Sequence, residues 1–185
     1  MEKGGTQTPE TILDLAERMR AYSIVPEFSF VLGSPTPTVE QDIEEDIRFI
    51  KKLKSINPLS EIVIYIYSPV HFEEADLFNA AQTRSFAYPS RLDDWLLPEW
   101  QIHDLRKRPV TPWLKKGDVN RIRNFERVLN ARFPTLSDLK LRDVHRAVLR
   151  LLGSWRYAVS LYSVPFEIML AHRLLRYRQP EIEGF

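Results

Sequence analysis

The sequence predicts an α/β protein in which one strand–helix–strand unit precedes a helical region. Three observations support this prediction. Two short apolar segments, residues 27–32 and 61–67, are typical of strands, and the segment between them has the spacing of an amphipathic helix. The second segment is nearly continuously apolar, as in parallel strands that are buried on both faces. The last third of the 185-residue chain holds three further helical patterns, at residues 118–132, 138–160 and 165–178.

The first helix is expected to begin just after Thr8. Thr8 is a suitable N-cap, Pro9 fits the first helical position, and Glu10 places negative charge near the positive end of the helix dipole. Pro26 ends this segment, and the strand over residues 27–32 follows. Apolar side chains recur at helical spacing along the helix, at Ile12, Leu15, Ala16 and Met19.

The second helix is expected to begin at Thr38 and to end before Asn57-Pro58. Gln41 lies three residues after Thr38, so this pair predicts a capping box. Acidic residues fill the first turns and lysines fill the last turns, which matches the helix dipole. We interpret the acidic cluster as a solvated helix face rather than as a metal site. The strand, helix and parallel strand form a right-handed unit that is typical of barrels and doubly wound sheets.

The segment after the second strand changes in character. Residues 73–83 have the pattern of a short helix, and residues 84–116 contain four prolines and three tryptophans. This connection is too aromatic for a flexible linker, so we expect its indoles to pack over the sheet or its helices. Each of the three later helices is expected to bury one apolar face. These faces consist of Val119, Ile122, Phe125, Val128 and Leu129; of Leu141, Val144, Val148, Leu151, Leu152 and Trp155; and of Phe166, Met169, Leu170 and Leu174.

The composition excludes several classes of protein. The chain contains no cysteine, which excludes disulfides, zinc–thiolate sites, thiol catalysis and any cluster held by its own cysteines. It has no run of 18 apolar residues that could cross a membrane, and its first residues lack the apolar core of a secretory signal. We therefore expect a cytoplasmic protein without membrane contact.

The charge is distributed unevenly along the chain. Residues 1–80 carry 7 Lys and Arg against 14 Asp and Glu, whereas residues 81–185 carry 19 against 11. Either the two halves neutralise each other in contact, which we favour, or the basic half binds nucleic acid. The basic, aromatic segment 140–178 is open to the same question, because arginines beside aromatic rings also form cation–π contacts within helical packing.

The sequence lacks the common motifs of catalysis and metal binding. Phosphate-binding glycine loops, GxSxG and HExxH are all missing. The four histidines are not spaced to share a metal ion; they are His71, His103, His145 and His172. We therefore predict no catalytic and no metal-ligating residue.

The best candidate for a ligand site is the edge at which the two parallel strands end. The turn at Gly33 follows the first strand, and Tyr65, Tyr67 and Ser68 end the second. The two tyrosines lie on one face of their strand and could stack on a planar ligand. From the residues alone, we favour ordinary core packing for the tyrosines and a simple tight turn at Gly33.

Several segments, taken in order, resemble the end of a radical SAM barrel of the cobalamin (B12)-binding-domain subgroup. They are residues 27–35, 38–50, 57–58 and 61–69, together with 112–114, 125–130, 155–157 and 177–185 in the tail. The resemblance implies the last βαβ portion of a partial parallel (β/α) TIM-like barrel, followed by an all-helical C-terminal extension. It divides the chain into a barrel segment (1–83), an irregular Trp- and Pro-rich connection (84–116) and a helical extension (117–185).

The resemblance also implies cofactors and site residues. Enzymes of this family bind S-adenosylmethionine and a [4Fe–4S] cluster, with cobalamin in this subgroup, and cleave S-adenosylmethionine to a 5′-deoxyadenosyl radical. The positions that correspond to the two strands around the adenosine are Phe30, Leu32, Gly33, Tyr65, Tyr67 and Ser68.

This chain departs from the family in one decisive respect. The CxxxCxxC loop that holds the cluster is missing, as are the first four barrel strands. We therefore expect a C-terminal fragment that is inactive alone and binds none of the three cofactors alone, produced by truncation, a misplaced start or a split gene. In a split enzyme, an N-terminal radical SAM polypeptide completes the barrel in trans. The alternative is a non-catalytic binding module that uses its basic, aromatic helical region on nucleic acid or another protein.

Overall fold

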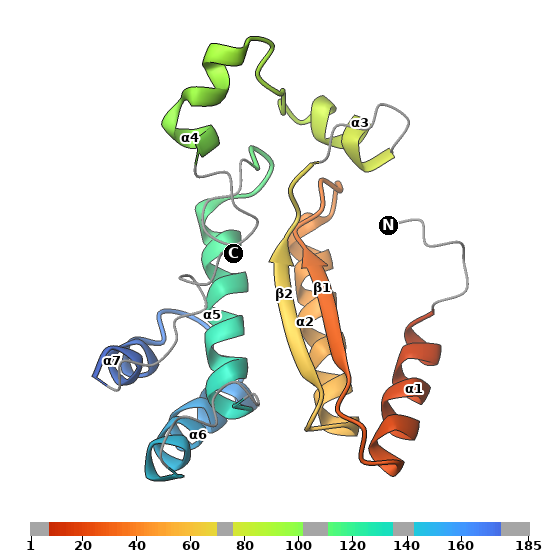
Figure 1. Ribbon diagram of the computed structural model, residues 1–185, viewed down its shortest axis with the longest axis vertical. Helices are drawn as coiled ribbons and strands as arrows, with labels where there is room; N and C mark the ends of the chain where they lie inside the picture. Colours follow the sequence, from red (N-terminus) through yellow and green to blue (C-terminus); the bar gives the residue numbers. More distant parts are fainter. Residues whose placement is uncertain (1–7, 70–75, 102–110, 135–142, 175–185) are drawn as a thin grey trace.

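The computed structural model describes residues 8–69, 76–101, 111–134 and 143–174. The fold is mixed α/β and mostly helical, with one two-stranded parallel sheet (Figure 1). The predictions for His71, His103 and Leu141, and for the end of the last helix, fall outside the described residues.

The sheet confirms the predicted βαβ unit. Strand β1 (Glu27–Leu32) pairs in parallel with strand β2 (Glu61–Ile66), with Glu27 opposite Glu61 and Leu32 opposite Ile66. Helix α2 (Val39–Ile56) connects the two strands. Its buried stripe packs against one face of the sheet, so the apolar spacing read from the sequence is the spacing used in the core. The stripe consists of Val39, Ile43, Ile47, Ile50 and Leu53.

Two further helices flank this unit. Figure 1 shows α2 behind the strands, α5 (Lys116–Arg132) beside β2, and α1 (Pro9–Ala21) on the side of β1. The side chain of Asn57 ties α1 to the end of α2, because its Nδ2 donates to the carbonyl oxygen of Ala16 at 3.2 Å. On the other side, Arg121 of α5 forms an ion pair with Glu44 of α2. The acidic and basic halves of the chain therefore meet here, as favoured from the sequence.

The expectation that β2 is buried on both faces is met on one face only, because Ile62, Ile64 and Ile66 are buried whereas Val63 and Tyr65 on the opposite face are half-buried. Strand β1 is more open, since its residues alternate between a face toward α2 and an opposite face on which Ser29 is exposed and Val31 is 37% exposed. The side chains toward α2 include Phe30, whose ring centroid lies 6.0 Å from that of Phe49 in α2. Continuous hydrophobicity thus marks a strand suited to burial on both sides, whereas the described helices cover one side only.

The helix starts were predicted with mixed success. Thr8 caps α1 as expected, with Thr8 and Thr11 exchanging side chain to backbone hydrogen bonds. The capping box predicted for α2 is wrong, because the Thr38 hydroxyl makes no bond to the helix backbone. It donates instead to Asp42 Oδ1 at 3.0 Å, one turn into the helix. A hydrogen bond to a carboxylate is stronger than one between neutral groups, so the Thr38 side chain adopts the orientation that makes this bond.

The aromatic connection lies over the end of the sheet, as predicted. It follows α3 (Asp76–Thr83) and includes the short helix η1 (Leu92–Leu96) and α4 (Pro98–Gln101). Ring contacts between 5.0 and 6.2 Å run without a break through this region. The rings belong to Trp95, Trp100, Tyr88, Phe86, Trp113 and Tyr67.

Within the described residues, helices lie where the last three were predicted, but not all of the predicted faces are buried. Helix α5 buries Ile122, Phe125, Val128 and Leu129 as predicted. In α6 (Asp143–Ala158), however, Val144 and Leu151 are 70% and 72% exposed. The predicted residues of α7 (Phe166–Leu174) are exposed as well, namely Phe166, Met169, Leu170 and Leu174.

Packing against α5 explains why α6 turns a different face inward. Gly153 of α6 lies so close to α5 that an added Cβ would be 2.6 Å from the backbone nitrogen of Arg132. The residues of α6 that are buried are those on this line, Leu149, Gly153 and Arg156. The close approach of α6 to the backbone of α5 at Gly153 therefore determines which face of α6 is buried, and the larger apolar side chains are exposed to solvent.

Arg156 is a structural residue of the helical region rather than a surface cation. Its guanidinium pairs with Glu167 of α7, with Nη2 and Oε2 2.8 Å apart, and donates to the carbonyl oxygen of Ser163 at 2.7 Å. It thereby joins the end of α6 to the start of α7. Among the described residues, no helix has the length and apolar character needed to cross a bilayer.

Candidate functional site

The turn predicted as a ligand contact is closed by the aromatic connection. Gly33 has a φ of +78°, and its carbonyl oxygen accepts a 2.8 Å hydrogen bond from Trp113 Nε1. A Cβ added at Gly33 would lie 2.9 Å from Leu114 Cδ1. The space above the turn is therefore filled by this chain's own side chains.

The six positions implied by the family resemblance lie on different faces of the two strands and in the turns that follow them. Phe30 and Leu32 point toward α2, whereas Tyr65 lies on the opposite face by strand alternation. Tyr67 packs on Trp113, with ring centroids 6.1 Å apart, and Ser68 beyond it is buried. Burial raises the pKa of the Tyr67 hydroxyl, with a further contribution from Tyr88. Phe30, Leu32 and Tyr67 thus contribute to the core and to the closed strand end, as favoured from the residues alone, whereas Tyr65 lies on the open face of the sheet.

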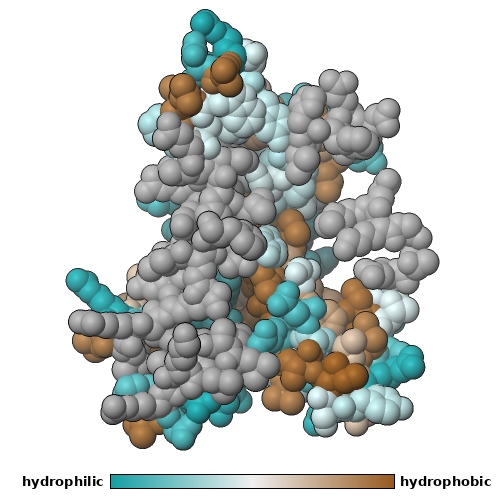
Figure 2. Space-filling model, in the orientation of Figure 1, coloured by the Kyte–Doolittle hydropathy of each residue, from teal (hydrophilic) through white to brown (hydrophobic). Residues whose placement is uncertain are grey.

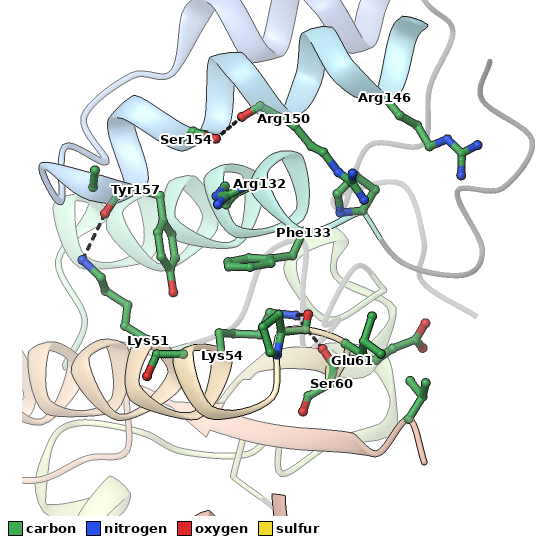
Figure 3. A pocket seen from close by; sticks show the side chains of 16 residues that line it. Lys51, Lys54, Ser60, Glu61, Arg132, Phe133, Arg146, Arg150, Ser154 and Tyr157 are labelled. Atoms are coloured by element: carbon green, nitrogen blue, oxygen red, sulfur yellow. Dashed lines mark hydrogen bonds between the residues drawn. The ribbon is translucent and has the colours of Figure 1, made fainter. Parts of the chain in front are cut away.

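A different site lies at the other end of the strands. A cleft of about 850 Å³ opens between the end of α2, the end of α5 and the outer part of α6 (Figure 3). We name it the basic cleft, because five basic side chains and one carboxylate, Glu61, are among its described lining residues. The basic residues are Lys51, Lys54, Arg132, Arg146 and Arg150.

The two lysines of the basic cleft are held by neutral oxygen atoms. Lys51 Nζ donates to the carbonyl oxygen of Tyr157 at 3.0 Å, and Lys54 Nζ donates to the carbonyl oxygens of Pro58 and Ser60 at 2.6 and 2.7 Å. Lys54 is only 4% exposed, and desolvation lowers its pKa to about 8, partly opposed by the charge of Glu61. Desolvation also lowers the pKa of Lys51. Carbonyl contacts satisfy the ammonium hydrogens but do not neutralise the charge.

The three arginines differ in how they are engaged. Arg146 pairs with Asp143 on its own helix, and Figure 3 shows its guanidinium turned away from the other basic groups. Arg132 lies 5.1 Å from the ring centroid of Phe133. Neither Arg132 nor Arg150 has a carboxylate partner within the described part of the chain. Within the described residues, the charges of these two guanidinium groups are therefore not compensated by a carboxylate.

Two aromatic rings stand between the basic groups. Figure 3 shows Phe133, at the end of α5, and Tyr157, on α6, extending toward α2. Their rings pack edge to face with centroids 5.3 Å apart. Lys54 Nζ lies 4.3 Å from the Phe133 centroid and Lys51 Nζ lies 5.0 Å from that of Tyr157. The Tyr157 hydroxyl is buried and has no hydrogen-bond partner among the described residues. Burial raises its pKa, so it remains a proton donor at neutral pH.

Sequence reasoning did not identify the basic cleft. The lysines near the end of α2 were visible but matched the helix dipole, and the arginines of residues 140–178 matched ordinary helical packing. The signal that distinguishes a site is the meeting of these two groups across about 100 residues, as in the contact between Lys51 and Tyr157. Within the described ranges, no cluster of three or more His, Asp or Glu side chains could hold a metal ion.

Comparison of the chain with protein-family models, with curated proteins and with solved structures finds no match.

Proposed function

We propose that this chain is a C-terminal segment of a B12-binding-type radical SAM enzyme that completes the barrel of a polypeptide carrying the cluster loop. The observation that carries the proposal is the unpaired edge of β1. Among the described residues the sheet has two strands, and β1 pairs with β2 alone. A parallel strand with an open edge is suited to accept a neighbouring strand.

The open face of the sheet supports the same proposal. Parallel sheets are normally covered on both faces, and in a closed barrel the face away from the helices forms the interior. Here Ser29 and Val31 are exposed on that face, and Tyr65 shares it. In the proposed assembly, these side chains become part of the interior when the remaining strands are supplied.

The cofactor sites of the family do not fit this chain. A [4Fe–4S] cluster requires thiolates, and the chain has no cysteine. Leu114 and Trp113 fill the space at Gly33, and Phe30 points toward α2 rather than toward an interior, so these residues do not form an adenosine pocket. In the proposal the partner therefore holds the cluster, and this chain contributes strands and shape.

Co-expression tests this role. The chain is produced together with an adjacently encoded polypeptide that carries CxxxCxxC, and the complex is separated by size exclusion. Val31→Asp is expected to abolish co-elution, because it places a carboxylate in a dry interior. Val144→Asp introduces the same change on the exposed face of α6 and is expected to leave the complex intact. Separate elution of the wild-type chains, or equal effects of the two variants, contradicts the proposal.

A second candidate function is a non-catalytic binding module. The basic cleft is the specific observation that favours it, since its charge is not used by the sheet. A monodisperse chain that binds an anionic ligand and leaves the cluster-bearing polypeptide unchanged in elution and in S-adenosylmethionine cleavage would favour this candidate over the first.

A further inference from the structure

We infer that the basic cleft binds a small molecule through its phosphate group. This inference is independent of the barrel proposal, because the cations of the basic cleft come from α2, α5 and α6, and no residue of β1 is among its described lining residues. Its failure would leave that proposal intact, and the reverse is also true.

The first argument is electrostatic. Of the five cationic side chains that line the basic cleft, Arg146 is paired with Asp143, and Glu61 is the single carboxylate among the described lining residues. Like charges in a shared, partly desolvated space repel one another more strongly than they would in water. Neither Arg132 nor Arg150 is offset by a carboxylate of the described residues. An anion in the basic cleft would offset this repulsion, which makes the site selective for negative charge.

The second argument is shape. Figure 3 shows Lys51 and Lys54 on α2 facing Arg132 on α5 across the rings of Phe133 and Tyr157. The volume of about 850 Å³ lies within the range of small-molecule sites, and aromatic walls with a few polar groups are typical of them. Nucleic acid is bound by grooves that follow an extended backbone, whereas these cations come from three elements around one concavity.

The third argument identifies phosphate among anions. A guanidinium presents a planar fork that matches two oxygens of a phosphate, and Arg132 and Arg150 supply two such groups. Several cations around one space suit an anion of charge −2 or more better than a single carboxylate. The Tyr157 hydroxyl adds a donor that has no partner among the described residues.

Isothermal titration calorimetry of the full chain with pyrophosphate, inorganic phosphate and AMP tests the inference at constant ionic strength. We expect saturable binding of at least pyrophosphate. Arg132→Gln and Arg150→Gln are each expected to weaken it about tenfold or more, the usual effect of losing hydrogen bonds to a charged group. Arg150→Lys keeps the charge but loses the fork, so it is expected to fall between Arg150→Gln and wild type.

The matched control is Lys52→Gln. Lys52 is exposed on α2, next to Lys51 in the chain but outside the basic cleft, so its replacement removes one positive charge without touching the site. Thermal melts of every variant separate loss of binding from loss of folding. A difference between AMP and inorganic phosphate would tell whether the ligand is a phosphate ester or the free ion.

Three outcomes overturn the inference. The first is the absence of saturable binding by all three probes. The second is equal weakening by Lys52→Gln and Arg150→Gln, which would indicate general charge attraction rather than a site. The third is binding of a short single-stranded RNA that displaces pyrophosphate and spans surfaces outside the basic cleft, which would assign these cations to nucleic acid.

Discussion

Trp113 Nε1 donates a buried 2.8 Å hydrogen bond to the carbonyl oxygen of Gly33, 80 residues earlier in the chain. This bond joins the aromatic connection to the end of β1. It satisfies a carbonyl oxygen that the turn would otherwise leave without a partner. It also closes the strand end at which the sequence predicted a ligand.

Replacing Trp113 by Phe tests the importance of this bond. Phe keeps an aromatic ring in contact with Phe86 and Tyr67 but leaves the Gly33 carbonyl oxygen unpaired. We expect the free energy of unfolding to fall by about 1–3 kcal/mol, measured by urea denaturation. Trp95→Phe changes a ring that is exposed and is expected to cost less. Equal losses in the two variants would show that ring size, rather than the hydrogen bond, determines the effect.

Gly33→Ala should destabilise the same turn for two separable reasons. A φ of +78° costs a non-glycine residue about 1–2 kcal/mol, and the new Cβ would press on Leu114 Cδ1 at 2.9 Å. In a double-mutant cycle, Leu114→Ala removes the clash but not the backbone strain. We expect Gly33→Ala to cost less in the Leu114→Ala background than in the wild type, while remaining destabilising. Strict additivity of the two changes would contradict the close contact.

Gly153→Ala should be more damaging, because the obstruction is backbone. The added Cβ would lie 2.6 Å from the nitrogen of Arg132 and 2.9 Å from the carbonyl carbon of Ala131, neither of which can rotate away. We expect α5 and α6 to move apart at a cost of about 2–3 kcal/mol in thermal or urea unfolding.

Gly117→Ala is the matched control for that prediction. Gly117 lies in the first turn of α5, and nothing lies within 4 Å of a Cβ added there. Alanine is the better helix former, so a gain of about 0.5–1 kcal/mol is expected. If Gly117→Ala lowered the free energy of unfolding as much as Gly153→Ala, the contact between α5 and α6 would not be the cause of the loss at Gly153.

Local signals in the sequence were sufficient to predict the βαβ unit. The isoleucines of α2 and the continuous apolar run of β2 depend only on neighbours within one element, so their periodicity predicted the core. Thr8 was identified as a cap for the same reason.

The predictions that were wrong depended on how one helix packs against another. Val144 and Leu151 form a regular apolar stripe on α6, yet Gly153 determines which side of the helix meets α5. A glycine carries no hydrophobic signal, so periodicity could not reveal this contact. The basic cleft was missed in the same way, because Lys54 and Arg132 come together only after α2 and α5 are packed.

The buried Lys54 should make stability depend on pH. Desolvation lowers its pKa to about 8, whereas in the unfolded chain it keeps the ordinary value of 10.5. Between these two values the unfolded state binds more protons than the folded state, so the free energy of unfolding rises with pH. From about pH 8 to about pH 9.5 we expect a gain of about 1–2 kcal/mol by urea denaturation. The range stops below pH 10, because the raised pKa of Tyr157 lowers the free energy of unfolding once the tyrosines of the unfolded chain ionise.

Two lysine variants test this prediction. In Lys54→Met the rise in stability should be reduced to what the lowered pKa of Lys51 contributes, whereas Lys52→Met, which replaces an exposed lysine, should retain the rise. An unchanged rise in Lys54→Met would mean that Lys54 is solvated in the folded chain.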